Sequence, residues 1–160
     1  MVMHPTVERF RRRATERYGY SGEIREFDIG TKSAQAAAEA LGCERGQIIK
    51  SMIMRVGDEF LLVLTSGDHR VDEAALADEC GVDPGDVATA NSDEVKAVTG
   101  WSIGGVPPFC YERDIAALAD PALRSYETLW GAAGTPNAMM AVTPAELVEF
   151  TDPRFVDVHA

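Results

Sequence analysis

One lysine in an apolar stretch is the residue whose type and position most directly indicate chemistry. Lys50 lies within Ile48-Ile49-Lys50-Ser51-Met52-Ile53-Met54, and the only other lysines are Lys32 and Lys96. An ammonium group in such a stretch loses hydration unless it finds a partner, reaches the surface or faces a polar pocket. Two interpretations stay open: a functional lysine in a pocket, or a lysine that protects the edge of a sheet from aggregation.

A segment rich in glycine and proline, Gly104-Gly105-Val106-Pro107-Pro108, is the second candidate. Paired glycines let backbone amides approach a ligand closely, and prolines stiffen the chain that follows. Amide donors in such a loop can stabilise a carbonyl oxygen that develops negative charge. The same residues are also typical of a turn with a purely structural role, so this alternative stays open.

Signatures of the common catalytic and cofactor-binding sites are absent from the sequence. His4, His69 and His159 are scattered, and no G-x-S-x-G, H-E-x-x-H, Walker or G-x-G-x-x-G motif occurs. Three cysteines, Cys43, Cys80 and Cys110, are odd in number and form no C-x-x-C pair. We therefore expect free thiols, no metal site and no cofactor.

The composition is that of an ordinary globular protein. The 160 residues are 46% hydrophobic and 26% charged, which predicts a single domain over residues 1–160. No apolar run is long enough to cross a bilayer, and the N-terminal residues lack the apolar core of a signal peptide. The expected location is the cytoplasm, without a membrane partner.

The net charge of −11 argues against broad nonspecific nucleic-acid binding, because such binding needs basic surface. The charge is uneven, however. Residues 1–20 hold five arginines and two glutamates, 5 − 2 = +3, so the remainder carries −11 − 3 = −14. This predicted N-terminal basic helix either contacts a few phosphates or presents a solvated charged face, and the sequence favours neither.

Periodicity and capping signals predict short helices and short strands without strict alternation. Helices are expected at residues 7–18, 34–41 (capped by Thr31 or Ser33), 73–80, 92–99 and 144–150. Strands are expected at residues 24–29, 48–56, 60–64, 87–90, 115–119, 128–132, 138–142 and 155–158, with a hairpin around Gly57-Asp58. This order favours an α+β fold with a mixed sheet.

The two candidate segments belong to an ordered set of motifs that runs through nearly the whole chain. The set includes Gly46-Gln47-Ile48-Ile49-Lys50-Ser51 and Gly104-Gly105-Val106-Pro107-Pro108-Phe109, together with residues 36–42, 66–72, 94–95, 99–101, 133–137 and 143–147. In this order and spacing the chain resembles the YbaK/prolyl-tRNA-synthetase-associated editing family. No single motif is decisive, and the ordered set carries the resemblance.

The resemblance implies both a fold and an activity. The implied fold is a curved, partly barrel-like mixed β-sheet surrounded by helices. The implied activity is that of a free-standing aminoacyl-tRNA deacylase, which hydrolyses in trans the ester between a wrong amino acid and tRNA, without metal or cofactor. The implied partner is the acceptor end of an aminoacyl-tRNA, and an aminoacyl-tRNA synthetase is a second candidate.

The resemblance also implies roles for individual residues. Lys50 would anchor the terminal nucleotide or polarise the ester, while amides of Gly104 and Gly105 would bind the carbonyl oxygen. Phe27 is expected either to stack near the acceptor end or to be a core aromatic. Ser51 would donate a hydrogen bond to a phosphate or ribose, or it would be a structural serine of the strand without a role in binding. The other expected substrate-binding residues are Val106, Pro108, which shapes the loop, Phe109, Gly134 and Asn137.

Three residues depart from the family pattern. Cys110 and Tyr111 stand where close relatives often carry glycine and histidine, and Asn137 stands where many carry histidine. Asparagine cannot act as a general base at neutral pH. The amino acid that is edited therefore stays open, and pocket volume is expected to decide it. Two alternatives are an inactive module that binds an amino-acid-like or nucleotide-like ligand, and an oligomeric interaction protein with a large exposed apolar patch.

Overall fold

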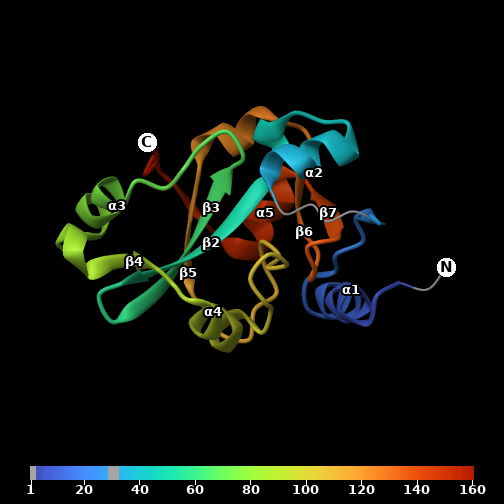
Figure 1. Cartoon of the computed structure of the whole chain (residues 1–160), viewed down its shortest axis with the longest axis horizontal. Helices are drawn as coiled ribbons and strands as arrows, with labels where there is room; N and C mark the ends of the chain where they lie inside the picture. The colour runs from blue at the N-terminus through green and yellow to red at the C-terminus, as the bar shows by residue number, and fades with distance from the viewer. Residues whose placement is uncertain (1–2, 29–32) are drawn as a thin grey trace.

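The computed structural model describes residues 3–28 and 33–160 and confirms the α+β class (Figure 1). The described helices are α1 (Pro5–Tyr18), α2 (Ala34–Leu41), α3 (Glu73–Cys80), α4 (Ser92–Thr99) and α5 (Pro144–Thr151). The described strands are β1 (Ile24–Glu26), β2 (Ile49–Val56), β3 (Glu59–Ser66), β4 (Val87–Thr89), β5 (Ala116–Ala119), β6 (Leu129–Ala132), β7 (Ala138–Val142) and β8 (Arg154–Phe155). None of these helices has the length and apolar composition needed to span a membrane.

The strands form two sheets rather than the one mixed sheet that we expected. The larger has the order β4-β2-β3-β5-β8, and the smaller has the order β1-β7-β6. In the larger sheet β2 is antiparallel to β3 and β4, whereas β5 is parallel to β3 and β8, so the mixed character is confirmed. A single parallel bridge between Ile48 and Trp130 joins the sheets at the start of β2.

Local capping chemistry sets the helix boundaries, which is why they agree closely with the prediction. Ser33, Asp72, Asn91 and Thr143 each accept a backbone N–H at a helix N-terminus. Glycines in the left-handed conformation end α1, α2, α3 and α4. The alternative cap Thr31 and the expected strand end Ile29 lie outside the described residues. Strand β8 is shorter than expected and does not include Val158.

Three short 3-10 helices were not predicted: η1 (Arg45–Gln47), η2 (Pro84–Asp86) and η3 (Pro121–Ser125). Such elements have only one turn, so they leave no periodic signal in the sequence. Two of them lead directly into β2 and β4. The helices η1 and η2 thus precede the first residues of β2 and β4, and the start of β2 lines the cavity described below.

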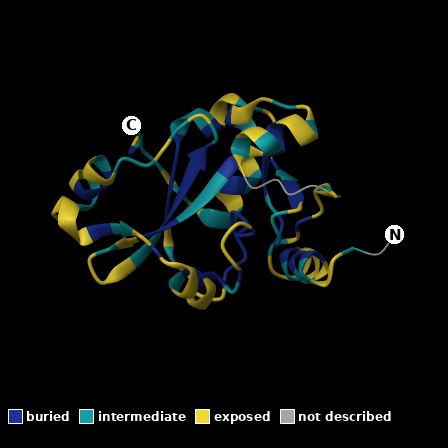
Figure 2. Cartoon of the chain, in the orientation of Figure 1, coloured by how far each residue is buried: buried dark blue, intermediate teal, exposed yellow. Residues whose placement is uncertain are grey.

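The larger sheet carries a hydrophobic core on each face, and its strand β3 is buried along most of its length (Figure 2). Ile49 and Ile53 of β2 belong to one core, together with Phe10 of α1 and Trp101. Met54 belongs to the other core, which contains Leu76 of α3. Because side chains alternate along a strand, Ser51 shares the first face with Ile49 and Ile53, whereas Lys50 and Met52 share the second face with Met54.

Candidate functional site

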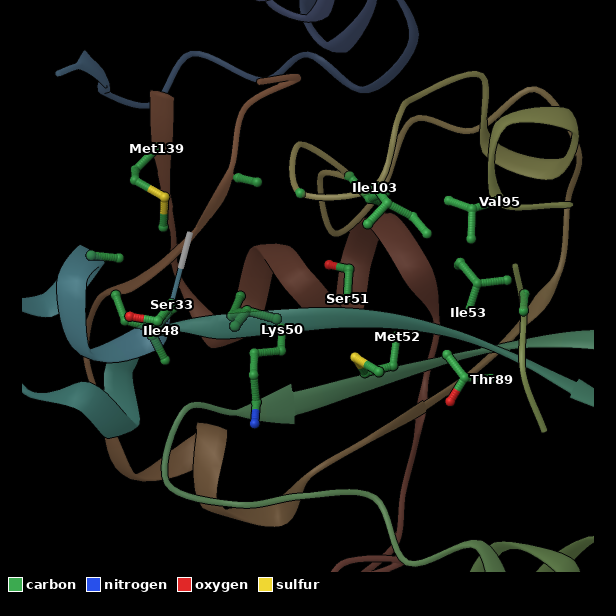
Figure 3. A pocket seen from close by; sticks show the side chains of 17 residues that line it. Ser33, Ile48, Lys50, Ser51, Met52, Ile53, Thr89, Val95, Ile103 and Met139 are labelled. Carbon is green, nitrogen blue, oxygen red and sulfur yellow. The ribbon is translucent and has the colours of Figure 1, made fainter. Parts of the chain in front are cut away.

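A cavity of about 340 Å³ opens along the outer edge of β2 (Figure 3). On that side β4 pairs with Met54–Val56, and the Ala90 amide donates to the Ile53 carbonyl. The next bridge along this edge is that of Ile48 with Trp130. Among the described strands, none pairs with β2 between these two points. The cavity therefore occupies a gap in sheet pairing. Helices α2 and α4, strand β7 and the loop at Ile103 and Gly104 contribute its other walls.

Ser51 presents unused polar groups at this gap. Its hydroxyl oxygen is buried and has no hydrogen-bond partner in the described part of the chain. The backbone of Ile53, two residues on, accepts a hydrogen bond from Ala90 across the same edge. Since strand backbone groups alternate in direction, the N–H and C=O of Ser51 also point toward the open edge. Ser51 thus directs two main-chain groups toward the open edge and carries a buried hydroxyl without a partner among the described residues.

Tyr111 closes the space behind Ser51. Its hydroxyl donates a hydrogen bond to the Pro107 carbonyl at 2.7 Å. Burial raises the pKa of Tyr111. The Ser51 hydroxyl is close enough to oppose this rise, but the two hydroxyl groups do not meet the geometry of a hydrogen bond. The phenol therefore stays protonated at neutral pH, and its proton is committed to the glycine-proline loop. Tyr111 braces the loop, and it makes no hydrogen bond to the Ser51 hydroxyl.

Lys50 stands at the boundary between two cavities. Its side chain points away from Ser51 and Ile103 (Figure 3), and its Nζ donates a hydrogen bond to the His69 carbonyl oxygen. It lines both the main cavity and a second cavity of about 270 Å³, to which Arg70 also contributes. Burial lowers the pKa of the Lys50 amine, and the nearby Arg70 lowers it further. A negatively charged group placed beside Lys50 would therefore stabilise its ammonium form.

The two glycines of the loop differ in position. Gly104, with φ of 95°, lines the cavity, and its amide has no acceptor within residues 3–28 and 33–160. Gly105 does not line the cavity, and its amide donates to the Ser102 carbonyl at 3.0 Å. A Cβ on Gly105 would lie 2.5 Å from the Gly134 carbonyl oxygen. Gly105 thus permits two loops to touch, whereas Gly104 is the glycine of the pair that lines the cavity and whose amide has no acceptor among the described residues.

Two other predicted site residues, Pro108 and Phe109, support the loop from behind. Pro108 lies against Gly131 of β6, where an added Cβ would be 2.9 Å from its ring. Phe109 is buried among the aromatic rings of Phe10, Tyr18, Tyr20 and Phe150. Both residues line a separate cavity of about 240 Å³, as does Cys110. Val106, by contrast, lines the main cavity as expected.

Phe27, Gly134 and Asn137 lie outside the cavity lining. Phe27 is half-buried and packs in a cluster with Ile48 and Met139, which do line the cavity. The Phe27 amide donates to the Asn137 carbonyl at 2.7 Å, while the Asn137 side chain is exposed. Gly134 is buried, and its amide donates to the Gly105 carbonyl at 2.9 Å.

Sequence reasoning missed the arginines that hold the loop. Arg9 stacks on Trp101 and donates to the Gly100 carbonyl, and Arg13 pairs with Glu112 at 3.0 Å. Arg17 donates to the Tyr111 carbonyl at 3.0 Å. Their spacing of four residues places all three on one face of α1, which is the signal that the sequence contained. These arginines bind the chain itself rather than facing solvent alone.

The thiols and possible metal ligands are dispersed. Cys43, Cys80 and Cys110 are free, as expected, and Cys110 is the buried one. Within the described residues, no three side chains of His, Cys, Asp or Glu gather in a way that suits a metal ion. Among the described residues, the exposed large apolar side chains are those of Ile103, which lines the cavity, and Val148. They lie on different elements.

A family model described as "aminoacyl-tRNA editing domain" matches residues 29–150. The uncharacterized protein YwhH of Bacillus subtilis is 31% identical over 130 residues, which are 81% of each chain. The proline–tRNA ligase of Bacillus licheniformis is 33% identical over 146 residues, but the match covers 86% of this chain and only 25% of the ligase. The crystal structure of a proposed trans-editing enzyme for prolyl tRNA synthetase is 34% identical, covers 99% of both chains and has a TM-score of 0.90.

The mixed fold, with a cavity between the β2 edge and the glycine-proline loop, is shared with solved editing-type relatives only as a fold. The chain belongs to the aminoacyl-tRNA editing domain family, and its functional class is aminoacyl-tRNA editing. The resemblance noted from the motifs is thereby confirmed.

Proposed function

We propose that this protein is a deacylase that acts in trans on aminoacyl-tRNA carrying a small, uncharged amino acid. The observation that carries the proposal is the cavity itself, in which Lys50 is the only charged residue among the described residues of the lining. Walls such as Ile48, Met52 and Val106 favour an apolar side chain and exclude a charged one. A relative that matches over 99% of both chains, and whose printed description is trans-editing, supports action in trans.

The polar groups at the cavity suit the parts of an aminoacyl ester. The Gly104 amide would donate to the ester carbonyl oxygen as it gains negative charge. Lys50, between the two cavities and beside Arg70, would bind the phosphate or ribose of the terminal nucleotide. The Ser51 hydroxyl and main chain would orient the amino acid or ribose. Gly105, Pro108, Phe109 and Gly134 would act indirectly, by holding the loop that carries Gly104.

The reaction needs little from protein side chains. A water oxygen adds to the ester carbonyl carbon, the bond from that carbon to the ribose oxygen breaks, and the ribose oxygen leaves with a proton. We propose that an adjacent ribose hydroxyl assists the water, because the described cavity lining contains no histidine or carboxylate that could serve as a base. Hydrolysis is therefore expected to proceed unchanged in the presence of a chelator.

The test is deacylation of alanyl-, cysteinyl- and prolyl-tRNA by the parent protein, Lys50→Ala and Lys96→Ala. Lys96 is exposed on α4 and is the matched control for loss of a lysine. We expect the parent and Lys96→Ala to hydrolyse at least one substrate equally, and Lys50→Ala to be slower by about tenfold or more. Equal rates for the parent and Lys50→Ala on every substrate would favour the alternative, a ligand-binding module on the same fold.

A further inference from the structure

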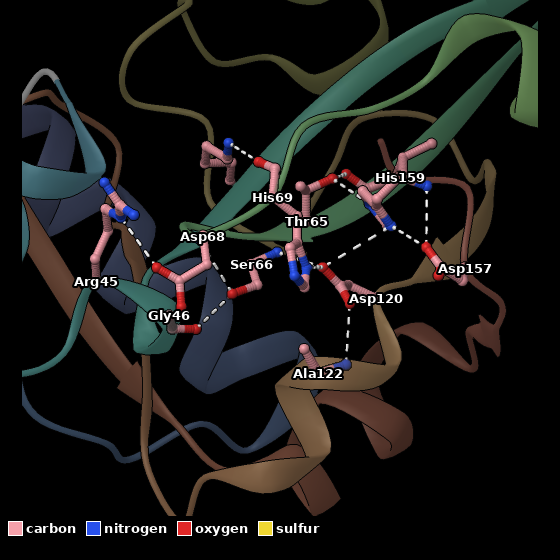
Figure 4. A network of polar contacts seen from close by, with 12 residues as sticks. Arg45, Gly46, Thr65, Ser66, Asp68, His69, Asp120, Ala122, Asp157 and His159 are labelled. Atoms are coloured by element: carbon pink, nitrogen blue, oxygen red, sulfur yellow. Dashed lines mark hydrogen bonds and ion pairs between the residues drawn. The ribbon is translucent and has the colours of Figure 1, made fainter.

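A buried carboxylate lies outside the cavity, at the end of β3 (Figure 4). Asp120 is only 2% exposed, yet its carboxylate is fully engaged. It accepts the amides of Ser66 at 3.2 Å and Ala122 at 2.9 Å, and its Oδ2 lies 2.6 Å from Nδ1 of His69. Burial alone would raise the pKa of this carboxyl, but the hydrogen bonds from His69 and the two amides outweigh it and lower the pKa. Asp120 is therefore an anion that accepts from His69.

His69 connects this anion to Lys50. The His69 ring contacts Asp120, while the His69 carbonyl oxygen accepts the hydrogen bond from Lys50 Nζ. His69 belongs to the loop that follows β3, where Asp68 and Arg70 are exposed. The loop is also held by the Ser66 hydroxyl, which accepts the Asp68 amide, and by the Ala160 amide, which donates to the Arg70 carbonyl. A further tether is the ion pair between Arg45 and Asp68, both of which are largely solvated. Exposed pairs of this kind contribute little rigidity.

The second histidine of the cluster supports the same strand. His159 is buried, its Nε2 lies 3.1 Å from the Thr65 hydroxyl, and its Nδ1 lies 3.9 Å from Asp120. Thr65 is the residue paired with Lys50 across the β2–β3 hairpin. The network thus approaches Lys50 both through the loop and through the neighbouring strand. A buried carboxylate is weak evidence for a contribution to stability, which leaves positioning as the better account of its presence.

We propose that His69, oriented by Asp120, is a positioning residue for Lys50. By fixing the carbonyl oxygen that receives the ammonium, His69 holds the positive charge at the boundary between the two cavities. Its relevance to hydrolysis rests on the proposed function, but its effect on Lys50 does not. A positional error of about 1 Å at a group that binds the substrate is enough to change a rate severely.

The test compares His69→Asn with His69→Gln. The Asn amide nitrogen stands near the position of Nδ1 and can still donate to Asp120, whereas the Gln amide extends past it. Asp157→Asn is the control, because the Asp157 side chain contacts His159 and not the loop. The first readout is an NMR titration of protein labelled with 13C at its lysines. The chain has only three lysines, so comparison with Lys50→Arg assigns the Lys50 signal.

In the parent, Arg45, Arg70, Asp68 and Asp120 are the charged groups that act on the Lys50 amine. We expect the Lys50 titration midpoint to rise toward the ordinary lysine value in His69→Gln, where Asp120 keeps its charge, because the freed amine gains water. It should stay near that of the parent in His69→Asn and Asp157→Asn. The second readout is kcat/KM for aminoacyl-tRNA, expected to fall about tenfold in His69→Gln and to recover within about threefold in His69→Asn.

An unchanged Lys50 midpoint in folded His69→Gln would overturn the inference, even if the parent protein edits tRNA. Equal losses of kcat/KM in His69→Asn and His69→Gln, with that midpoint unmoved, would also overturn it. A parent without any hydrolysis, combined with the expected movement of the Lys50 midpoint, would instead remove the proposed function and support the positioning role. Thermal unfolding of each variant verifies that the compared proteins are folded.

Discussion

Ser51 and Lys50 are neighbours in the chain, yet their side chains leave β2 on opposite faces of the sheet. This follows from the two-residue repeat of a strand. Ser51 faces the main cavity and the loop, while Lys50 crosses the other face to reach the His69 carbonyl. A substrate that contacts both residues must therefore pass around the unpaired edge of β2. Two adjacent residues can in this way hold two different parts of one ligand.

Removing the Ser51 hydroxyl should separate activity from stability. In Ser51→Ala we expect kcat/KM to fall by about three- to tenfold, because one hydrogen bond to the substrate is lost. The free energy of unfolding should stay constant or rise by up to about 1 kcal/mol, because a buried hydroxyl without a partner is removed. Urea unfolding and a deacylation assay measure the two effects. A stability loss that parallels the activity loss would show that the hydroxyl has a structural role.

The lowered pKa of Lys50 predicts a stability cost at neutral pH. A lysine whose folded pKa lies below its unfolded value destabilises the fold at low and neutral pH, and this cost disappears as the pH rises past the unfolded value, 10.5. Lys50→Met should therefore be more stable than the parent at pH 7, with a difference that narrows toward pH 10.5. Urea unfolding at several pH values tests this. A less stable Lys50→Met at pH 7 would contradict it, and Lys96→Met is the control.

At the scale of elements, the loop over residues 100–111 is the feature that shapes the cavity. It is held from α1 by Arg9 and Arg17, from within by the Tyr111–Pro107 hydrogen bond, and from β6–β7 by the contact of Gly105 with Gly134. None of these contacts lies in the cavity. The loop is thus built as a rigid support for the Gly104 amide.

Gly105→Ala should disturb this support strongly, since the new Cβ would meet the Gly134 carbonyl at 2.5 Å. We expect a loss of about 1–3 kcal/mol in the free energy of unfolding and a fall in kcat/KM. Gly85→Ala is the matched control, because a Cβ there meets nothing within 4 Å. Chemical denaturation of both variants provides the comparison. Equal stability of the two proteins would show that the loops can separate without cost.

The elements were predictable because their signals are local. Caps such as Asn91 with Glu94 and the Gly57 turn gave boundaries close to the observed ones. The face occupied by Lys50 was not predictable, because residues 48–54 are apolar on both sides and show no alternation. Asp120 and His69 are separated by 51 residues, and no local pattern joins them. The motifs indicated the strand and the loop of the site, while its geometry depends on long-range contacts.

At the scale of the molecule, charge limits how tRNA can be held. Three of the five arginines in α1 bind their own chain, so the basic surface is smaller than the sequence indicated. Among the described residues, Arg45 and Arg70 are the cations that act on Lys50 at the boundary of its two cavities. With a net charge of −11, the protein is suited to grip a short single-stranded end rather than a helical body.

Binding of tRNA should therefore weaken with salt along a shallow slope. Each phosphate neutralised in a single strand contributes about −0.7 to the slope of log K against log salt, so two contacts predict roughly −1.4. Fluorescence anisotropy with a labelled acceptor-stem oligonucleotide at several salt concentrations measures this slope. Arg70→Ala should remove one phosphate contact and so make the slope shallower by about 0.7. A slope steeper than about −4 would indicate broad phosphate binding instead.

The family model begins at residue 29, after α1 and β1. Yet α1 supplies Phe10 to the core and the arginines to the loop, and β1 pairs with β7 beside the cavity wall. A fragment cut at the family borders would therefore lose the arginines that hold the loop over residues 100–111 and would expose the core residues that pack on Phe10. Anyone who shortens this protein for crystallisation, fusion or transplantation into another enzyme should keep the first helix attached.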